Sequence, residues 1–475
     1  MPQLQCQKAN DGLGGRVAIH SAPALDYFSE QSQGPESIGH SIGETLRAVI
    51  PDQEAERTLI WFHNPGLARN VILNQEVMRF CEKSGASLIL HHHDFWCSGR
   101  WARWQEMEQC GRNTLEKAAA ITLGSTDRSV HVSINLSDWK SLAGTIGDHV
   151  FHLPNPVVRP QRVSSIRIRN LQKWVDQELQ TSGPIWICPT RFLRRKNLLE
   201  AILLTRWLRP DAIFVTTSGN ASVDELPYAR MIKNAAEKGG WNVRFGILDK
   251  PGAPRVDELL RVAEVALLTS VQEGFGMGFV EASASGIPLI ARAMPDVMPD
   301  LEALGFRFPH LYPEVYIAPS LIDVSAESDR QYQLRLRAKG DLPSVLKSRF
   351  QPTLIDFDQP IAFSRLTWQG QLEVLNRSPK SAWEACRPLN PVLEKIHGNL
   401  DNDDDDKDTF NPPPPAESAG VNKTKPLPQN MTSNNDVMFR TLGRAPQPNY
   451  EGGDDLDLND YSIYGNNKTN EEYYK

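Results

Sequence analysis

The sequence has few of the features that would place it in a membrane or in an oxidising compartment. No apolar run in its 475 residues approaches the roughly 20 residues that a membrane helix needs. The first residues, Met-Pro-Gln-Leu-Gln-Cys-Gln-Lys, lack the apolar core of a signal peptide. The 6 cysteines are scattered without C-x-x-C spacing, which is typical of reduced thiols. We therefore expect a cytoplasmic protein without a transmembrane segment.

The sequence also lacks a positive charge excess. The whole chain has a formal net charge of −7, and residues 399–475 contain 15 acidic and 7 basic residues, so residues 1–398 are close to neutral. Such a balance does not favour nucleic-acid binding. Residues 399–475 also show no periodic apolar face that would dock on a domain, and we expect an acidic disordered tail there, whose partner is unknown.

The rest of the chain alternates apolar strand-like runs with amphipathic helical segments, which predicts an α/β fold with parallel sheets covered on both faces. The predicted strands are Arg16–His20, Thr58–His63, Ser87–His92, Ala119–Leu123 and Asp148–Leu153 in the first half, and Pro184–Cys188, Ala212–Thr216, Asn242–Ile247, Val265–Thr269 and Ile287–Ala291 in the second. Three prolines among residues 154–160 fit a linker between the halves.

The most informative stretch is a glycine-rich turn between two glutamates in the second half. Glu273 and Glu281 bracket Gly-Phe-Gly-Met, which follows a predicted buried strand and opens a predicted helix over Met277–Ser285. A helix N-terminus after a glycine turn presents free amides and a positive dipole end, which suits an anion. Carboxylates beside it suit hydroxyl groups instead. Phosphate and polyol together indicate a nucleotide sugar.

A basic turn precedes another amphipathic helix of the same half, Leu198–Leu208. Four cations, Arg191, Arg194, Arg195 and Lys196, fall between a predicted strand and this helix. Charge-assisted contacts of this kind suit a leaving diphosphate, whose developing charge needs stabilisation.

With these residues in view, the chain resembles the retaining glycosyltransferases of the GT-B fold, in the family-4-like branch called glycosyl transferases group 1. The resemblance rests on the E-x7-E signature from Glu273 to Glu281, followed by Ala-Ser-Ala-Ser-Gly-Ile-Pro, and covers roughly residues 16–377. It implies two Rossmann-like domains that face a cleft.

The resemblance also implies roles for the residues of the donor side. Glu273 would face the hydroxyls of the donor sugar, and Glu281 would hold the ribose. Arg191 and Lys196 match the family's cations that neutralise the donor diphosphate. The amides offered to sugar and phosphate would be those of Gly274, Phe275, Gly276 and Met277.

The acceptor side is predicted in the first half. His93 and Asp94 follow the strand Ser87–His92 and match the family's pair beside the reacting sugar. Arg100 suits an anionic acceptor, and Asn64 and Arg69 lie in another loop that would open into the cleft. The residues alone leave two other readings: a structural turn, or a metal site made by the histidine triplet with Cys97. Three adjacent histidines cannot all point one way along a strand.

The predicted domains are an acceptor-side Rossmann-like domain over 1–157, a linker over 158–183, a nucleotide-sugar domain over 184–362, a helix returning to the first domain over 363–385, and the tail over 399–475. The predicted function is retaining transfer of a hexose from a UDP-, GDP- or ADP-sugar to an unknown acceptor. Neither a cofactor nor a metal is expected, since cations replace Mg²⁺. The alternatives are an inactive GT-B binding or scaffold protein and a sugar-nucleotide epimerase.

Overall fold

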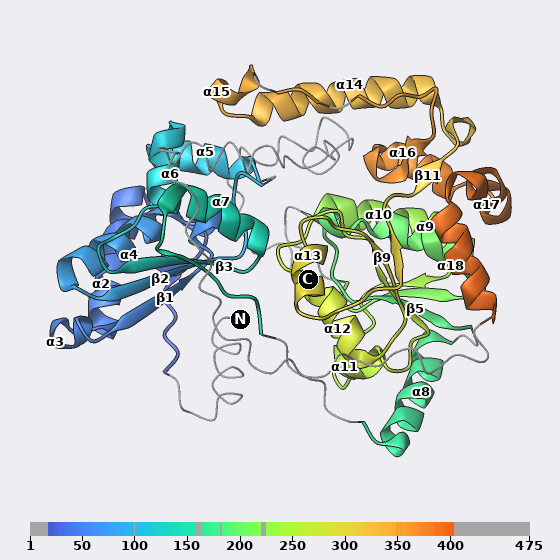
Figure 1. The fold of residues 1–475 in the computed structure, drawn as a ribbon, viewed down its shortest axis with the longest axis horizontal. Helices are drawn as coiled ribbons and strands as arrows, with labels where there is room; N and C mark the ends of the chain where they lie inside the picture. The colour runs from blue at the N-terminus through green and yellow to red at the C-terminus, as the bar shows by residue number, and fades with distance from the viewer. Residues whose placement is uncertain are drawn as a thin grey trace.

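The computed structural model describes residues 18–98, 100–156, 163–180, 183–219, 225–348, 350–352 and 354–402. Within these ranges the chain forms two α/β domains, each built on a parallel sheet (Figure 1). The carboxyl ends of the first sheet's strands face the second domain. The two-domain GT-B architecture expected from the sequence is confirmed.

The first domain has a four-stranded sheet in the order β1-β2-β3-β4. Its strands are β1 (Leu59–His63), β2 (Ser87–His92), β3 (Ser129–Ser133) and β4 (Val150–His152). Its helices are α2 (Pro35–Val49), α3 (Asp52–Ala55), α4 (Val71–Ser84), α5 (Ala102–Gln109), α6 (Leu115–Thr122) and α7 (Leu136–Ile146). The strands lie side by side in the order in which they occur in the sequence. Right-handed connections therefore place the connecting helices α4 to α7 on the same face of the sheet.

The other face of this sheet has no helix over it among the described residues. Its apolar side chains are therefore open, with 56% of Leu59, 47% of Trp61, 51% of Phe151 and 42% of Leu153 exposed. The described residues of the first domain therefore do not show the expected cover on both faces of the sheet. The reason is topological, since strands on the far side of β1 would be needed to bring helices to this face.

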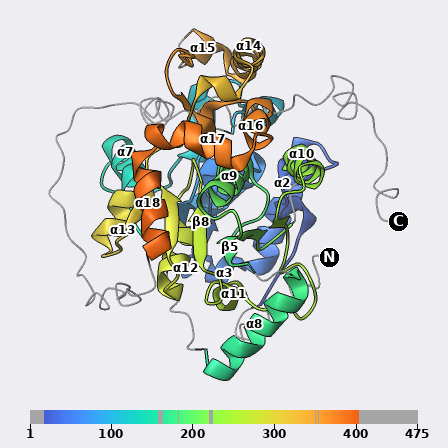
Figure 2. The ribbon, with the colours of Figure 1, turned by 90° about the vertical axis from the view of Figure 1, so that its right-hand side faces the viewer.

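The second domain has a six-stranded sheet in the order β10-β9-β8-β5-β6-β7. The strands are β5 (Ile185–Cys188), β6 (Ile213–Thr216), β7 (Val243–Arg244), β8 (Val265–Leu268), β9 (Leu289–Arg292) and β10 (His310–Tyr312). The helices around it are α8 (Ser165–Leu179), α9 (Leu198–Leu208), α10 (Leu226–Lys238), α11 (Val256–Leu259), α12 (Met277–Ser285) and α13 (Met298–Ala303). They cover both faces, with α9 and α10 on one side and α11 and α12 on the other (Figures 1 and 2).

Most strand predictions agree with the structure, and the predicted segments that do not form strands lie in the first half of the chain. Residues 119–122 belong to helix α6, not to a strand, because an alanine-rich segment favours a helix and Thr114 caps it by accepting a hydrogen bond from the Lys117 amide. The strand predicted over Arg16–His20 begins outside the described residues, and residues 18–20 form no strand. Strands β3 and β10 are not predicted from the sequence.

The segment that reaches back to the first domain is not the one predicted. The predicted returning helix, 363–385, contains α16 (Trp368–Leu375) and most of α17 (Pro379–Cys386), and both pack on the second domain. Trp368 contacts Tyr228 with ring centroids 5.2 Å apart, and Trp383 contacts Trp207 at 5.4 Å. Burial of these large aromatic rings holds the segment where it is.

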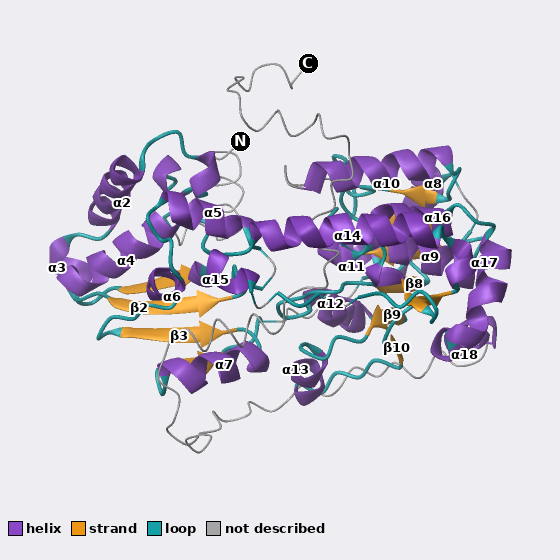
Figure 3. Cartoon of the chain, turned by 90° about the horizontal axis from the view of Figure 1, so that it is seen from above, coloured by secondary structure: helices purple, strands orange, loops and turns teal. Residues whose placement is uncertain are grey.

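The crossing is made instead by α14 (Val324–Asp341) and α15 (Ser344–Lys347). Seen from above, α14 extends from the second domain toward α15, which lies over the first (Figure 3). Leu346 of α15 is only 5% exposed and belongs to the first domain's apolar cluster with Trp96, Met107 and Leu142. A short antiparallel pair, β11 (Tyr316–Ile317) with β12 (Ile361–Ala362), brings together the chain before α14 and the chain after α15.

The last described element is α18 (Pro391–Asn402). Its Leu393 and Ile396 are buried in the core of the second domain. The helix thus extends past residue 399, where the sequence analysis begins the tail. Residues 403–475 lie outside the described part of the chain.

Candidate functional site

The site lies where strand order reverses in the second sheet. Strands β5 and β8 are neighbours at the centre of the sheet, and the chain proceeds outward from them in opposite directions. In such sheets the loops after the two central strands separate and leave a crevice at their carboxyl ends. The loop after β5 carries Arg194, Arg195 and Lys196, and the loop after β8 carries Glu273. The two predicted donor elements therefore meet at one point.

Ion pairs join these two loops. Arg195 Nη1 lies 2.7 Å from Glu273 Oε2, Lys196 Nζ bonds Glu273 Oε1, and Arg195 also donates to the Gln272 carbonyl at 3.0 Å. Burial would raise the pKa of Glu273, but Lys196 and Arg195 reverse the effect and leave this pKa below its usual value. Glu273 is therefore an ionised acceptor held between two cations.

Lys196 also acts on the second glutamate of the signature. Partial burial raises the pKa of Glu281, and the charge of Lys196 opposes that shift. Glu281 is on α12, whose first residue follows Gly276 without a side-chain cap. Amides of the first turn are therefore left for another acceptor. Gly276 has φ of +87°, and a Cβ there would lie 2.7 Å from Val297 Cγ1, so this position requires glycine.

Loops of the first domain contact the donor loop directly. A Cβ on Gly274 would lie 2.8 Å from the His93 carbonyl oxygen, so the absence of a side chain allows the close approach. Asn135 Nδ2 donates to the Gly274 carbonyl at 3.0 Å, and Gln272 Nε2 donates to the Ser98 carbonyl at 2.6 Å. The predicted His93-Asp94 pair therefore borders Glu273's loop across the domain boundary.

The predicted acceptor residues are not brought together as one group. Arg100 pairs with Asp94 at 3.3 Å, beside His93. Asn64 accepts hydrogen bonds from the amides of His93 and Asp94, at 3.3 and 3.0 Å, and so fixes that loop. Arg69 instead places its guanidinium over the Tyr27 ring, 4.5 Å from the centroid.

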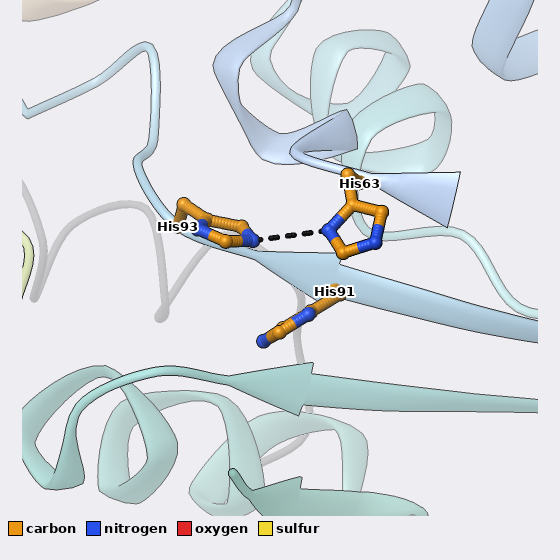
Figure 4. A group of neighbouring side chains, drawn as sticks. All are labelled: His63, His91 and His93. Atoms are coloured by element: carbon orange, nitrogen blue, oxygen red, sulfur yellow. Dashed lines mark hydrogen bonds between the residues drawn. The ribbon is translucent and has the colours of Figure 1, made fainter. Parts of the chain in front are cut away.

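His93 lies against two other histidines. Its Nε2 is 3.2 Å from Nδ1 of His63, and its ring centroid is 4.5 Å from that of His91 (Figure 4). Burial, with His63 next in importance, lowers the pKa of His93, while Asp94 opposes the change. The imidazole of His93 is therefore neutral near neutral pH.

Among the basic residues, the structure favours a different pair from the sequence. Arg191 is exposed, whereas the adjacent Arg195 and Lys196 hold Glu273. Gln272 and Asn135 are contacts that the sequence analysis does not identify, and it names Arg195 only as one of four cations. The resemblance selects Arg191 and Lys196, but which cations contact Glu273 depends on how the turn after β5 folds, and no local sequence pattern shows this.

Comparisons with known proteins identify the second domain. Residues 172–306 match the family model described as "Glycosyl transferases group 1". The match includes the basic turn, the glycine-rich loop and both glutamates of the signature. The matched residues all lie in the second domain.

Two curated proteins of Petrotoga mobilis (strain DSM 10674 / SJ95) are similar to the chain. A mannosylglucosyl-3-phosphoglycerate synthase is 24% identical over 334 residues, which cover 66% of this chain and 63% of that protein. A mannosylglucosylglycerate synthase is 24% identical over 265 residues, covering 51% of this chain and 60% of that protein. The matches thus span less than two thirds of the length of these relatives.

Solved structures with a similar arrangement include HepE of Anabaena with UDP and a sucrose-phosphate synthase of Thermosynechococcus elongatus. The first is 13% identical, with a TM-score of 0.41 and coverage of 76% of this chain and 82% of that one. The second is 14% identical, with a TM-score of 0.42 and coverage of 77% and 79%.

No helix among the described residues is long and apolar enough to cross a membrane.

Proposed function

We propose that this chain is a retaining hexosyltransferase that moves a hexose from a nucleoside-diphosphate sugar to an acceptor. The observation that carries the proposal is the meeting of Lys196 and Arg195 with Glu273 at the switch point of the second sheet. Next to them lies the start of α12, which has no side-chain cap. Cations and free amides suit a diphosphate, and ionised carboxylates suit sugar hydroxyls.

Each part of the donor has a proposed partner. Lys196 and Arg195, with Arg191 at the start of the same loop, contact the diphosphate and stabilise its charge as it leaves. Glu273 accepts hydrogen bonds from the hexose, Glu281 from the ribose, and the amides of the turn at 274–277 take the remaining oxygen atoms. Preorganised donors of this kind act where charge develops.

We propose that transfer at this site retains the configuration of the anomeric carbon. In the proposed reaction the bond between the anomeric carbon and the diphosphate oxygen breaks, and the acceptor hydroxyl attacks on the same face. The leaving diphosphate takes the proton of that hydroxyl, so the chain needs no separate general base. His93 and Asp94 line the reacting face from the first domain, and the contact of Gly274 with the His93 carbonyl supports this placement.

Acceptor candidates come from the similar proteins. Both synthases of Petrotoga mobilis carry a glycerate in the names of their products. A small anionic acceptor is therefore the first class to test, with Arg100, paired to Asp94, as the cation that would contact it.

A binding protein without activity and a sugar-nucleotide epimerase are the alternatives. An inactive module has no need to keep an ionised glutamate buried between two cations, and Glu273 has a side chain only 10% exposed. This observation favours an enzyme over an inactive binding protein, because burying an ion pair carries a desolvation cost.

A thermal-shift screen tests the donor site. UDP, GDP and ADP, each alone and as its hexose conjugate, are added to the full chain. A ligand at 100 times its dissociation constant stabilises by about 2.7 kcal/mol, which raises the melting temperature measurably. Release of a nucleoside diphosphate on addition of acceptor then tests transfer. A screen in which no nucleotide raises the melting temperature would refute the donor site.

A further inference from the structure

Three histidines from two neighbouring strands form a cluster on the open face of the first sheet. His63 ends β1, His91 lies opposite it in the parallel register of β2, and His93 follows two residues later. Residues two apart along an extended chain lie on one face, so His91 and His93 point the same way and meet His63 (Figure 4). One ring nitrogen from each lies within 4.8 Å of the others.

These separations are close to those of a metal site. In a tetrahedral zinc site, with Zn–N bonds of 2.0–2.1 Å, two ligand nitrogens are about 3.3 Å apart. Nδ1 of His63 and Nε2 of His93 are already 3.2 Å apart. Small side-chain rotations complete the set, and His63 is exposed, so its ring is free to adjust.

The surroundings favour a transition metal over a hard cation. Imidazole nitrogens prefer Zn²⁺, Ni²⁺ or Cu²⁺, while Mg²⁺ and Ca²⁺ prefer oxygen ligands. The indole N–H of Trp61 donates to His91 Nδ1 at 3.2 Å. Metal binding displaces this bond, and the half-exposed indole can turn to water.

The cluster differs from the metal site considered in the sequence analysis. His92 points to the opposite face, where its Nε2 is 2.9 Å from His131 Nδ1. Cys97 is buried in the first domain's apolar cluster, and burial raises the pKa of its thiol to about 12, which disfavours the thiolate. Neither His92 nor Cys97 therefore belongs to the cluster. Its third histidine is His63, which is 28 residues before His91 in the chain.

We propose that His63, His91 and His93 form a binding site for a single divalent transition-metal ion of the zinc class. A set of three imidazoles leaves a coordination position for water or an anionic group. The site shares His93 with the proposed reacting face but contains none of the cations that face the donor diphosphate, and its existence does not depend on the proposed transferase activity.

Direct binding measurements on untagged, chelator-treated full-length protein test the site. Calorimetry with Zn²⁺ is expected to give one ion bound per chain. Titration with Co²⁺ is expected to give the visible absorption bands of a tetrahedral site. Mg²⁺ at the same concentration is expected to give no binding at this site.

Substitutions locate the ion. His63→Ala and His93→Ala are each expected to weaken Zn²⁺ binding at least tenfold and to remove the Co²⁺ bands. His40→Ala is the matched control, because His40 is an exposed histidine on α2, and it should bind as wild type does. Thermal unfolding without metal checks that all variants fold. No saturable binding in wild type, unchanged affinity in His63→Ala and His93→Ala, or loss of binding in His40→Ala would each overturn the proposal.

Discussion

Among single residues, Lys196 connects the parts of the proposed donor site. It bonds Glu273, and its charge acts on Glu281 one helical turn into α12. With Arg195 beside it, Glu273 has a depressed pKa although it is largely buried. A diphosphate bound beside Lys196 and Arg195 would compete with Glu273 for both cations. Binding of the proposed leaving group would then free the Glu273 carboxylate to accept hydrogen bonds from the sugar.

The two glutamates of the signature are expected to respond differently to substitution. Glu281→Ala should weaken binding of a free nucleoside diphosphate by about tenfold or more, because its proposed partner is the ribose. Glu273→Ala should largely spare that binding and lower turnover, because its partner is the sugar. Calorimetry with the nucleotide identified by the thermal-shift screen measures the first, and initial rates measure the second. Equal loss of nucleotide in both variants would contradict these roles.

The cations can be ranked in the same way. Lys196→Ala and Arg195→Ala should each weaken a nucleoside diphosphate much more than the matching monophosphate, because the second phosphate is their proposed partner. Arg191→Ala removes a cation that the resemblance favours. It should weaken diphosphate binding least of the three variants, since Arg191 is exposed. Ratios of the two dissociation constants measure this. A larger effect at Arg191 than at Arg195 would restore the prediction made from sequence.

Gly274 is expected to accept no side chain without loss of activity. In Gly274→Ala the new Cβ would lie 2.8 Å from the His93 carbonyl, so the first domain must move away from the donor loop. Turnover should fall while free nucleotide binding changes little. Gly34→Ala is the control, because a Cβ at Gly34 has no neighbour within 4 Å. Wild-type turnover in Gly274→Ala would show that the contact is not needed for catalysis.

At the scale of elements, α14 and α15 connect the domains. The second domain sends α14 outward, and α15 inserts Leu346 into the apolar cluster of the first. This crossing adds to the hydrogen bonds of Asn135 and Gln272, and to the bond from the Leu136 amide to Asp300 Oδ2 at 2.8 Å. The domains are therefore held both at the site and far from it.

Removing the Leu346 side chain should loosen this connection. Large-to-small changes in a core cost roughly 2–5 kcal/mol, and Leu346 is 5% exposed. Leu346→Ala should lower the melting temperature of the first domain and increase proteolysis near α15. Leu336→Ala on α14 is the matched control, since Leu336 is 49% exposed. Equal stability of the two variants would show that α15 is not anchored.

At the scale of the whole molecule, the position of the last helix determines where the chain can be shortened. Deleting residues 403–475 should leave melting temperature and transfer activity nearly unchanged, because this segment has no periodic apolar face. Deleting from residue 391 also removes α18, whose Leu393 and Ile396 are buried in the second domain. That deletion should lower the melting temperature by several degrees.

Limited proteolysis gives an independent measure of the same boundary. Cleavage is expected first beyond Asn402, leaving a stable fragment of about 400 residues. A drop in stability or activity on removal of 403–475 alone would mean that this segment docks on a domain.

Most elements of the second domain follow from local patterns in the sequence. The bounds of α9 and α12 are those predicted, and the predicted strands of this domain are present. Long apolar runs and the glycines that end them are local signals. They are strong here because the strands of a sheet covered on both faces are apolar at nearly every position. The glycine-rich turn and its two glutamates could be read for the same reason, because the turn is encoded within a few residues.

The remaining features depend on tertiary contacts. Strand β3 carries polar Ser129, His131 and Ser133 on its buried face, so its pattern does not resemble a core strand. Arg195 contacts Glu273 beside Lys196 because of the path of the turn after β5. Residue 346 reaches the first domain only because α14 spans the distance. His63 joins His91 and His93 because the register of β1 and β2 places residues far apart in the chain side by side. Each depends on contacts between distant segments, which no local pattern encodes.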